Sequence, residues 1–152
     1  MKTLSTILIA STLVALGFTK SDFLNTVTDA HQQADQLHSC WEPVDENNAA
    51  AGYKLSEELY TFCSWMAHAS DMTKFYVNGV DPESDDYAKF DAHFDKENKE
   101  YAALTVCLQE GFSFRGPEQP SRVSLRCLCK RSGCNIPRSM DQFFDFNKHP
   151  LQ

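Results

Sequence analysis

Cysteine is the residue type in this sequence with the widest range of chemistry. A cysteine thiolate can act as a nucleophile, bind zinc or form a disulfide, and the number and spacing of the residues help to separate these uses. The chain contains six: Cys40, Cys63, Cys107, Cys127, Cys129 and Cys134. In a secreted chain, an even count favours disulfides over a catalytic thiol. Zinc is the alternative for the last three cysteines, although Cys-x-Cys-x4-Cys is not the usual spacing of a zinc finger or ribbon.

Three acidic residues imitate the start of a calcium-binding loop. Asp81, Glu83 and Asp85 alternate as the first ligands of an EF-hand do. However, Asp86 stands at the sixth position, where that loop needs glycine, and Ala92 stands at the twelfth, where it needs glutamate. We therefore expect no metal site here. An acidic helix N-terminus is the simpler role for these carboxylates.

The remaining candidates for catalysis are Asp91, His93 and Asp95. Alternate residues of a helix point to different faces, so a solvated acidic surface explains these three better than an oriented base or a metal site. The sequence contains no Gly-x-Ser-x-Gly, His-Glu-x-x-His or phosphate-binding loop. It therefore predicts a protein that is not an enzyme and uses no cofactor. An unrecognised secreted hydrolase is a remaining alternative.

The start of the chain has the pattern of a cleavable signal peptide. Lys2 supplies a positive charge, residues 4–16 are uncharged and largely apolar, and Ala15 and Gly17 are small residues at the positions that a signal peptidase reads. A membrane helix needs about 20 apolar residues, and the C-terminal segment lacks the hydrophobic tail of a lipid-anchor signal. We therefore expect cleavage after Gly17 and a secreted, extracellular protein with neither a membrane span nor a lipid anchor.

The charge is unevenly distributed along the chain. The formal net charge is −7 and becomes −8 when Lys2 is removed with the leader, which argues against general binding to nucleic acid. Acidic residues predominate over residues 81–100, whereas basic residues predominate over residues 115–138. Either these segments pack together or are solvated, or the basic segment contacts an acidic surface of a partner.

The elements that must position these residues are suggested by hydrophobic periodicity. Residues 22–39 are expected to form an amphipathic helix. Its apolar stripe is Phe23, Val27, Ala30, Ala34 and Leu37. Residues 55–66 fit helical spacing but contain enough aromatic side chains for a strand, so both remain open. Residues 76–80 indicate an extended piece with a turn, and residues 84–94 a short helix.

The clearest pattern lies in the last third of the chain. Residues 122–130 alternate between apolar and mostly polar side chains, which is typical of a half-buried strand. Residues 103–114 are its expected partner, with 115–121 as the tip of the hairpin. This hairpin would bring Cys107 near Cys127 or Cys129, so a bridge is expected to join its strands.

Together these patterns predict a small disulfide-rich α+β fold. It has an N-terminal amphipathic helix, a helical middle segment and a C-terminal β-hairpin closed by a Cys-x4-Cys-Asn loop. The expected organisation is a signal peptide at 1–17, a helical segment at 18–39, a disulfide-rich domain at 40–135 and a C-terminal tail at 136–152.

The segment from Cys129 to Asn135 resembles the Cys-x4-Cys-Asn ending of three-finger domains of the Ly6, snake-toxin and activin-receptor ectodomain kind. The match is specific over residues 107–135, as in a divergent member with added helices. Among the fifteen connectivities that six cysteines allow, the resemblance implies the pairs Cys40–Cys63, Cys107–Cys127 and Cys129–Cys134.

These observations point to a secreted, extracellular protein-binding domain that acts as a soluble ligand, modulator or decoy. Arginine and aromatic residues are the usual anchors of interfaces, so the hairpin tip and the basic turn after it are the candidate partner-binding residues. They are Phe114, Arg115, Gly116, Arg122, Lys130 and Arg131. A carrier of a small apolar ligand is the alternative, and the sequence indicates neither the partner nor the oligomeric state.

Overall fold

The computed structural model describes residues 26–68, 71–84, 87–94, 97–112 and 122–148, and their structure is mostly β. The elements are α1 (Thr26–Gln33), β1 (Trp41–Pro43), η1 (Ala49–Ala51), β2 (Tyr53–Leu55), β3 (Phe62–His68), β4 (Asp71–Val80), η2 (Ala88–Phe94), β5 (Thr105–Phe112), β6 (Arg122–Cys129) and α2 (Met140–Asn147). Elements η1 and η2 are 3-10 helices. None of the described helices is long and apolar enough to cross a bilayer.

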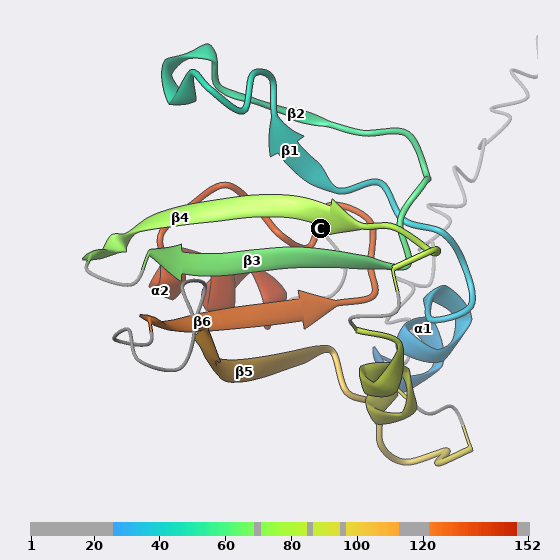
Figure 1. The fold of residues 1–152 in the computed structure, drawn as a ribbon. Helices are drawn as coiled ribbons and strands as arrows, with labels where there is room; N and C mark the ends of the chain where they lie inside the picture. Colours follow the sequence, from blue (N-terminus) through green and yellow to red (C-terminus); the bar gives the residue numbers. More distant parts are fainter. Residues whose placement is uncertain (1–25, 69–70, 85–86, 95–96, 113–121, 149–152) are drawn as a thin grey trace, which may run out of the picture.

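The strands form two antiparallel sheets. One is the pair β1–β2, and the other has four strands in the order β4-β3-β6-β5. Successive pairs β1–β2, β3–β4 and β5–β6 extend in the same direction, and α2 lies behind the larger sheet (Figure 1). The expected α+β class with a helical middle segment is therefore wrong, because that part of the chain contains the long strands β3 and β4.

Strand β3 explains the misreading of the middle segment. Trp65 and Ala67 are buried on the side of α2, whereas Phe62 and Ser64 are buried on the opposite side. A strand that is buried on both faces has no polar alternation, so its apolar residues also fit helical spacing. Residues 76–80, expected as an extended piece with a turn, continue strand β4.

The N-terminal helix is shorter than the expected span of 22–39. It ends at Gln33, and the chain then turns so that His38 pairs with Tyr60 in an isolated antiparallel bridge. The His38 amide donates to the Tyr60 carbonyl at 2.7 Å. Leu37, assigned to the apolar stripe, is 44% exposed. The two backbone hydrogen bonds of this bridge replace those that a longer helix would make.

The sheet carries a core on each face. Trp65, Val77 and Cys127 pack against Phe143 of α2, whose ring centroid is 5.2 Å from that of Trp65. This helix lies in the segment expected to be a tail. On the other face, η2 places Phe94 at 5.7 Å from Phe62, between ring centroids. Element η2 occupies the expected short helix at 84–94, as a 3-10 helix.

All six cysteines form disulfides, and one of these bridges joins β5 to β6. The pairs are Cys40–Cys63, Cys107–Cys127 and Cys129–Cys134, which are the pairs that the resemblance implies. Four of these cysteines, those at 40, 63, 129 and 134, form one buried cluster. It lies next to the first residue of β1, at the start of β3 and at the end of β6. Strands β5 and β6 occupy the expected antiparallel pair, but β6 also pairs with β3.

Candidate functional site

A row of side chains crosses the face of the sheet opposite α2. The strand register places Tyr76 beside Met66, Met66 beside Arg126, and Arg126 beside Leu108. We call this set the tyrosine–arginine row. Because neighbouring side chains on one face of a sheet lie about 5 Å apart, the row forms one continuous strip. Tyr76 is 55% exposed at the β4 end of the strip.

Arg126 is held in place from several directions. Its Nε donates to Glu110 Oε2 at 2.9 Å, and Nη1 donates to Ser64 Oγ at 3.3 Å. The guanidinium lies 5.0 Å from the centroid of the Tyr87 ring. An arginine fixed by a carboxylate, a hydroxyl and an aromatic ring loses little further conformational freedom when it contacts a partner.

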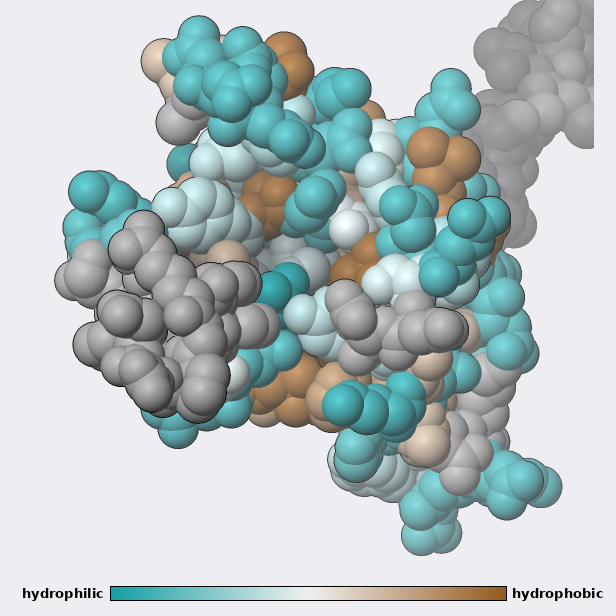
Figure 2. Space-filling model, in the orientation of Figure 1, coloured by the Kyte–Doolittle hydropathy of each residue, from teal (hydrophilic) through white to brown (hydrophobic). Residues whose placement is uncertain are grey.

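The face around the row mixes polar and apolar groups. The imidazole of His68 lies 5.8 Å from the Tyr76 ring, between centroids. Lys74 is 71% exposed on β4 and forms an ion pair of 3.6 Å with Asp71. Seen from the side of the molecule opposite α2, hydrophobic and hydrophilic residues lie next to each other over the sheet (Figure 2). A mixed composition is shared by transient interfaces and the rest of a protein surface, so the residue types in the row, rather than the mixture, carry the argument.

The structure separates the partner-binding residues predicted from the sequence. Phe114, Arg115 and Gly116 lie outside the described residues. Arg122 begins β6, opposite Phe112, whereas Lys130 and Arg131 follow the other end of that strand. Since a strand rises about 3.3 Å per residue, Arg122 and Lys130 are roughly 26 Å apart. They therefore do not form one compact patch.

Lys130 is occupied by contacts within the chain. Its Nζ donates to the carbonyl of Ala34 at 2.9 Å and forms an ion pair with Asp91. It also lies 4.9 Å from the centroid of the Phe62 ring. The side chain is 10% exposed. Lys130 therefore joins the end of α1 and element η2 to the sheet.

Arg131 has a similar role beside α2. Its Nη2 donates to Asn147 Oδ1 at 2.9 Å, and its guanidinium lies 5.4 Å from the Phe146 ring. Burial lowers the pKa of this guanidinium from its usual value. The basic turn consequently holds the helices against the sheet.

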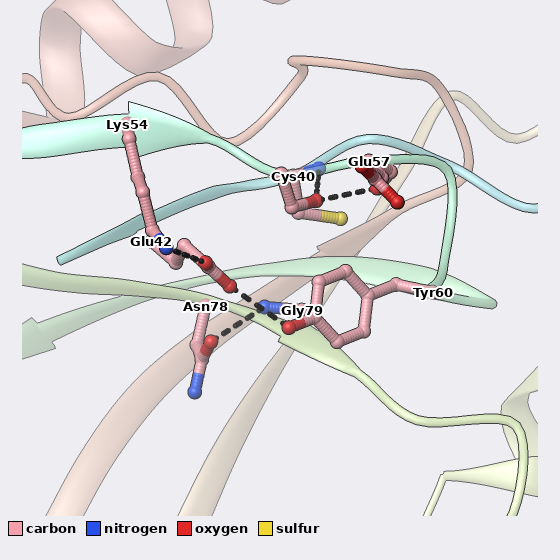
Figure 3. A network of polar contacts seen from close by, with 8 residues as sticks. Cys40, Glu42, Lys54, Glu57, Tyr60, Asn78 and Gly79 are labelled. Atoms are coloured by element: carbon pink, nitrogen blue, oxygen red, sulfur yellow. Dashed lines mark hydrogen bonds and ion pairs between the residues drawn. The ribbon is translucent and has the colours of Figure 1, made fainter. Parts of the chain in front are cut away.

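Figure 3 shows a second polar network, at the base of the β1–β2 pair. The phenol of Tyr60 donates to Glu42 Oε2 at 2.8 Å, and Lys54 forms an ion pair with Glu42 at 3.1 Å. Burial of the phenol, and then its hydrogen bond to Glu42, raises the pKa of Tyr60 to about 12. The protonated phenol thus links the segment before β3 to Glu42 of the β1–β2 pair.

Asp91 and His93, the two described residues among those considered for catalysis, make contacts with other groups. Asp91 is paired with Lys130, and the His93 ring stacks on Phe90 with centroids 6.1 Å apart. Asp95 lies outside the described residues. Within the described ranges, no three histidine, cysteine, aspartate or glutamate side chains are placed to hold a metal ion.

A small, partly open cavity lies between α1 and the basic turn, and its lining includes Asp29, Lys130, Arg131 and Asn147. Its volume is about 20 Å³. That space accommodates about one water molecule. Two other, more open hollows are larger, one of about 530 Å³ beside Tyr101 and Phe144 and one of about 460 Å³ beside Asp91 and Phe94.

Met66 and Tyr76 were not among the surface residues expected from the sequence. For Arg126 the sequence does contain a signal of exposure. Arg126 is a polar residue between the apolar Leu125 and Cys127 in the alternating pattern of β6. No comparable signal marks Tyr76, because the pairing of β3 with both β4 and β6 decides which side chains share a face.

Comparisons with known proteins were made over the whole chain. A family model described as "Family of unknown function (DUF5354)" matches residues 25–148. "Uncharacterized protein C02B8.3" from Caenorhabditis elegans is 46% identical over 128 residues, which cover 84% of this chain and 96% of the relative. "Uncharacterized protein C02B8.7" from the same organism is 37% identical over 43 residues, or 28% of this chain and 83% of the relative. No solved structure matches the chain.

Proposed function

We propose that this chain, which belongs to DUF5354, a family of unknown function, is a secreted, non-enzymatic domain. Its proposed role is to bind an extracellular protein. It acts as a soluble ligand, modulator or decoy. The observation that carries this proposal is the tyrosine–arginine row on the face of the sheet opposite α2, where Tyr76 is exposed.

The composition of the row supports a protein partner. Tyrosine and arginine are enriched among the residues that dominate binding energy, and methionine adapts to irregular partner surfaces. Arg126 is already fixed by Glu110 and Ser64, so its orientation does not have to be established on binding. A flat strip of this kind suits another protein better than a small molecule, which needs a concave pocket.

Secretion is supported by two independent features. Residues 1–17 have the composition of a signal peptide, and each of the six cysteines is in a disulfide. Disulfides form and persist in oxidising compartments. The proposal includes removal of the leader before the protein acts.

We also propose that the domain is a divergent relative of three-finger proteins. Its support is the succession of three antiparallel strand pairs from one cysteine cluster, together with the Asn135 that follows the last cysteine. Elements α1, η2 and α2 are additions to that plan.

The proposal can be tested with the full-length chain produced by a eukaryotic secretory cell. The collected protein is presented as a multivalent bait to an array of extracellular domains from the same organism. We expect a specific partner whose affinity falls at least tenfold when Tyr76 is replaced by alanine, since such anchors contribute about 1.4 kcal/mol or more.

The matched control is Leu55→Ala, because Leu55 is also an exposed strand residue, 48% accessible, but lies on the separate β1–β2 sheet. Retention of the chain inside the cell, or a partner that binds the Tyr76→Ala and Leu55→Ala variants equally well, would overturn the proposal.

A further inference from the structure

Strand β5 forms one border of the larger sheet. It pairs with β6 on one side and is the last strand in the sheet order (Figure 1). Over Thr105–Phe112 the register with β6 is continuous, without a bulge. The strand therefore presents a straight outer edge of backbone groups.

The disulfide Cys107–Cys127 shows which backbone groups point to that edge. These two cysteines are directly opposite each other with Cα atoms 4.0 Å apart. In antiparallel sheets, such short separations belong to the pairs that do not exchange backbone hydrogen bonds, and long ones to those that do. The amide and carbonyl of Cys107 consequently point away from β6.

Because the pattern alternates, the same orientation applies to every second residue of β5. The outward residues are Thr105, Cys107, Gln109 and Gly111. Their amides and carbonyls have no hydrogen-bond partner in the described part of the chain. The side chains of Cys107 and Gln109 and the backbone of Gly111 are also exposed.

Over Thr105–Phe112 the edge lacks lysine, proline and a bulge, three of the features that usually prevent strand addition. Natural sheets protect their borders with lysine, proline, bulges or a covering element. β5 contains neither lysine nor proline, and its one charged residue, Glu110, is bound to Arg126 of the same sheet. At the opposite border, by contrast, β4 carries Lys74 and the β3–β4 register is interrupted between Ala67 and His68.

We propose that β5 is a dimerisation edge that pairs antiparallel with β5 of a second copy of this chain. A two-fold axis through Leu108 places Thr105 opposite the second copy's Gly111, and Cys107 opposite the second copy's Gln109. Every outward residue then meets an outward residue, so all the free amides and carbonyls of the edge are satisfied. The two sheets become one sheet with twice as many strands.

The same register avoids repulsion between the side chains. Glu110 lies opposite the second copy's Val106, and Leu108 lies opposite its own copy at the axis. Like charges directly opposite each other would destabilise the pair, and this arrangement contains none over the strand. This self-complementarity is why the structure favours a second copy over an unrelated strand. The inference does not depend on the proposed partner-binding function.

The test uses sedimentation velocity on the full secreted chain over a range of concentrations. We expect a monomer–dimer equilibrium that is weakened by Gln109→Pro and preserved by Gln109→Thr. Proline removes the outward amide, but no hydrogen bond to β6. Since the two-fold axis doubles the effect, two hydrogen bonds are lost, and the dissociation constant should rise roughly thirtyfold.

Amide hydrogen exchange by NMR gives a second readout that needs no variant. In the dimer, the amides of Cys107, Gln109 and Gly111 become protected as concentration rises, whereas that of Leu108, bonded to β6, is protected throughout. A chain that stays monomeric at millimolar concentration overturns the proposal. So does a dimer in which the outward amides exchange freely, because its interface then lies elsewhere.

Discussion

The side-chain amide of Asn135 pairs with both backbone polar groups of Trp41. Its Oδ1 accepts from the Trp41 amide at 2.9 Å, and its Nδ2 donates to the Trp41 carbonyl at 2.9 Å. The same Nδ2 lies 3.1 Å from the Ser64 carbonyl and 3.2 Å from the Asn78 carbonyl. Asn135 thus takes the place of a strand residue and joins β1 to β3 and β4.

Replacing Asn135 by alanine should therefore destabilise the whole domain. The side chain is fully buried, so its loss leaves the Trp41 amide and several carbonyls without a partner or water. We expect the free energy of unfolding to fall by about 2 to 4 kcal/mol, measured by urea denaturation with disulfides intact. Asn47→Ala, at an exposed loop position, is the control and should change it by less than about 0.5 kcal/mol. Equal effects of the two substitutions would contradict this role.

Gly79 has no room for a side chain, because the ring of Tyr60 lies directly on its backbone. A Cβ atom there would lie 2.1 Å from the ring. Gly79→Ala should displace Tyr60, break its hydrogen bond to Glu42 and cost about 1 to 3 kcal/mol of stability.

The spectroscopic titration of Tyr60 provides the specific readout for this variant. Its pKa, raised to about 12 in the native chain, should return toward the ordinary value once the ring is exposed. Gly111→Ala is the matched control, since a Cβ there meets nothing within 4 Å. An unchanged phenol titration in Gly79→Ala would show that the ring does not depend on this glycine.

His38 should make the stability of the domain depend on pH. It is 1% exposed, and burial, followed by the nearby charge of Lys130, lowers its pKa from 6.5 to about 4. Above pH 6.5 the His38 ring is neutral in both the folded and the unfolded chain, so the folded state has its full stability with respect to this group. Between pH 6.5 and 4 the unfolded chain binds a proton that the folded chain does not, and up to about 3 kcal/mol is lost.

The measurement is the free energy of unfolding from pH 7.5 to pH 4 for the native chain and His38→Gln. Carboxylates affect the native chain and the variant alike. A smaller change of the unfolding free energy with pH in the variant therefore gives the contribution of His38. His93→Gln, at an exposed position, should keep the native slope. If NMR places the pKa of His38 near 6.5, the prediction fails.

Lys130 should contribute to stability rather than to recognition. Lys130→Met keeps the apolar stem against Phe62 but removes the contacts with Ala34 and Asp91. We expect a loss of about 1 to 3 kcal/mol and faster amide exchange in α1, detected by NMR. Lys54→Met is the control because Lys54 is 57% exposed. If Lys130→Met abolished partner binding while amide exchange in α1 stayed unchanged, Lys130 would be a binding residue and this prediction would be wrong.

Local patterns were sufficient for the β5–β6 pair, since alternating side chains and a tip rich in glycine and proline act within one short segment. They were insufficient for β3, because burial on both faces removes the alternation that identifies a strand. They also missed α2, whose eight residues include three phenylalanines among charged neighbours and resemble a solvated tail.

The candidate site was harder to predict than the fold. The sequence shows that Lys130 and Arg131 are cations, but not that Ala34, Asp91 and Asn147 will meet them from distant parts of the chain. Similarly, Met66 and Tyr76 become neighbours of Arg126 only through the order of the strands. Long-range pairing, rather than residue type, decides which of these side chains remain available to a partner.

The position of Phe143 has a consequence for biosynthesis. This residue fills the core beside Trp65, yet it belongs to α2, which follows all the described strands in the chain. A ribosome releases the N-terminal part first, so the sheet can pair while the apolar surface around Trp65 is still uncovered. That surface is shielded only once α2 has left the ribosome. A nascent chain truncated before α2 should therefore be a chaperone client, with its strands formed and its core unfinished.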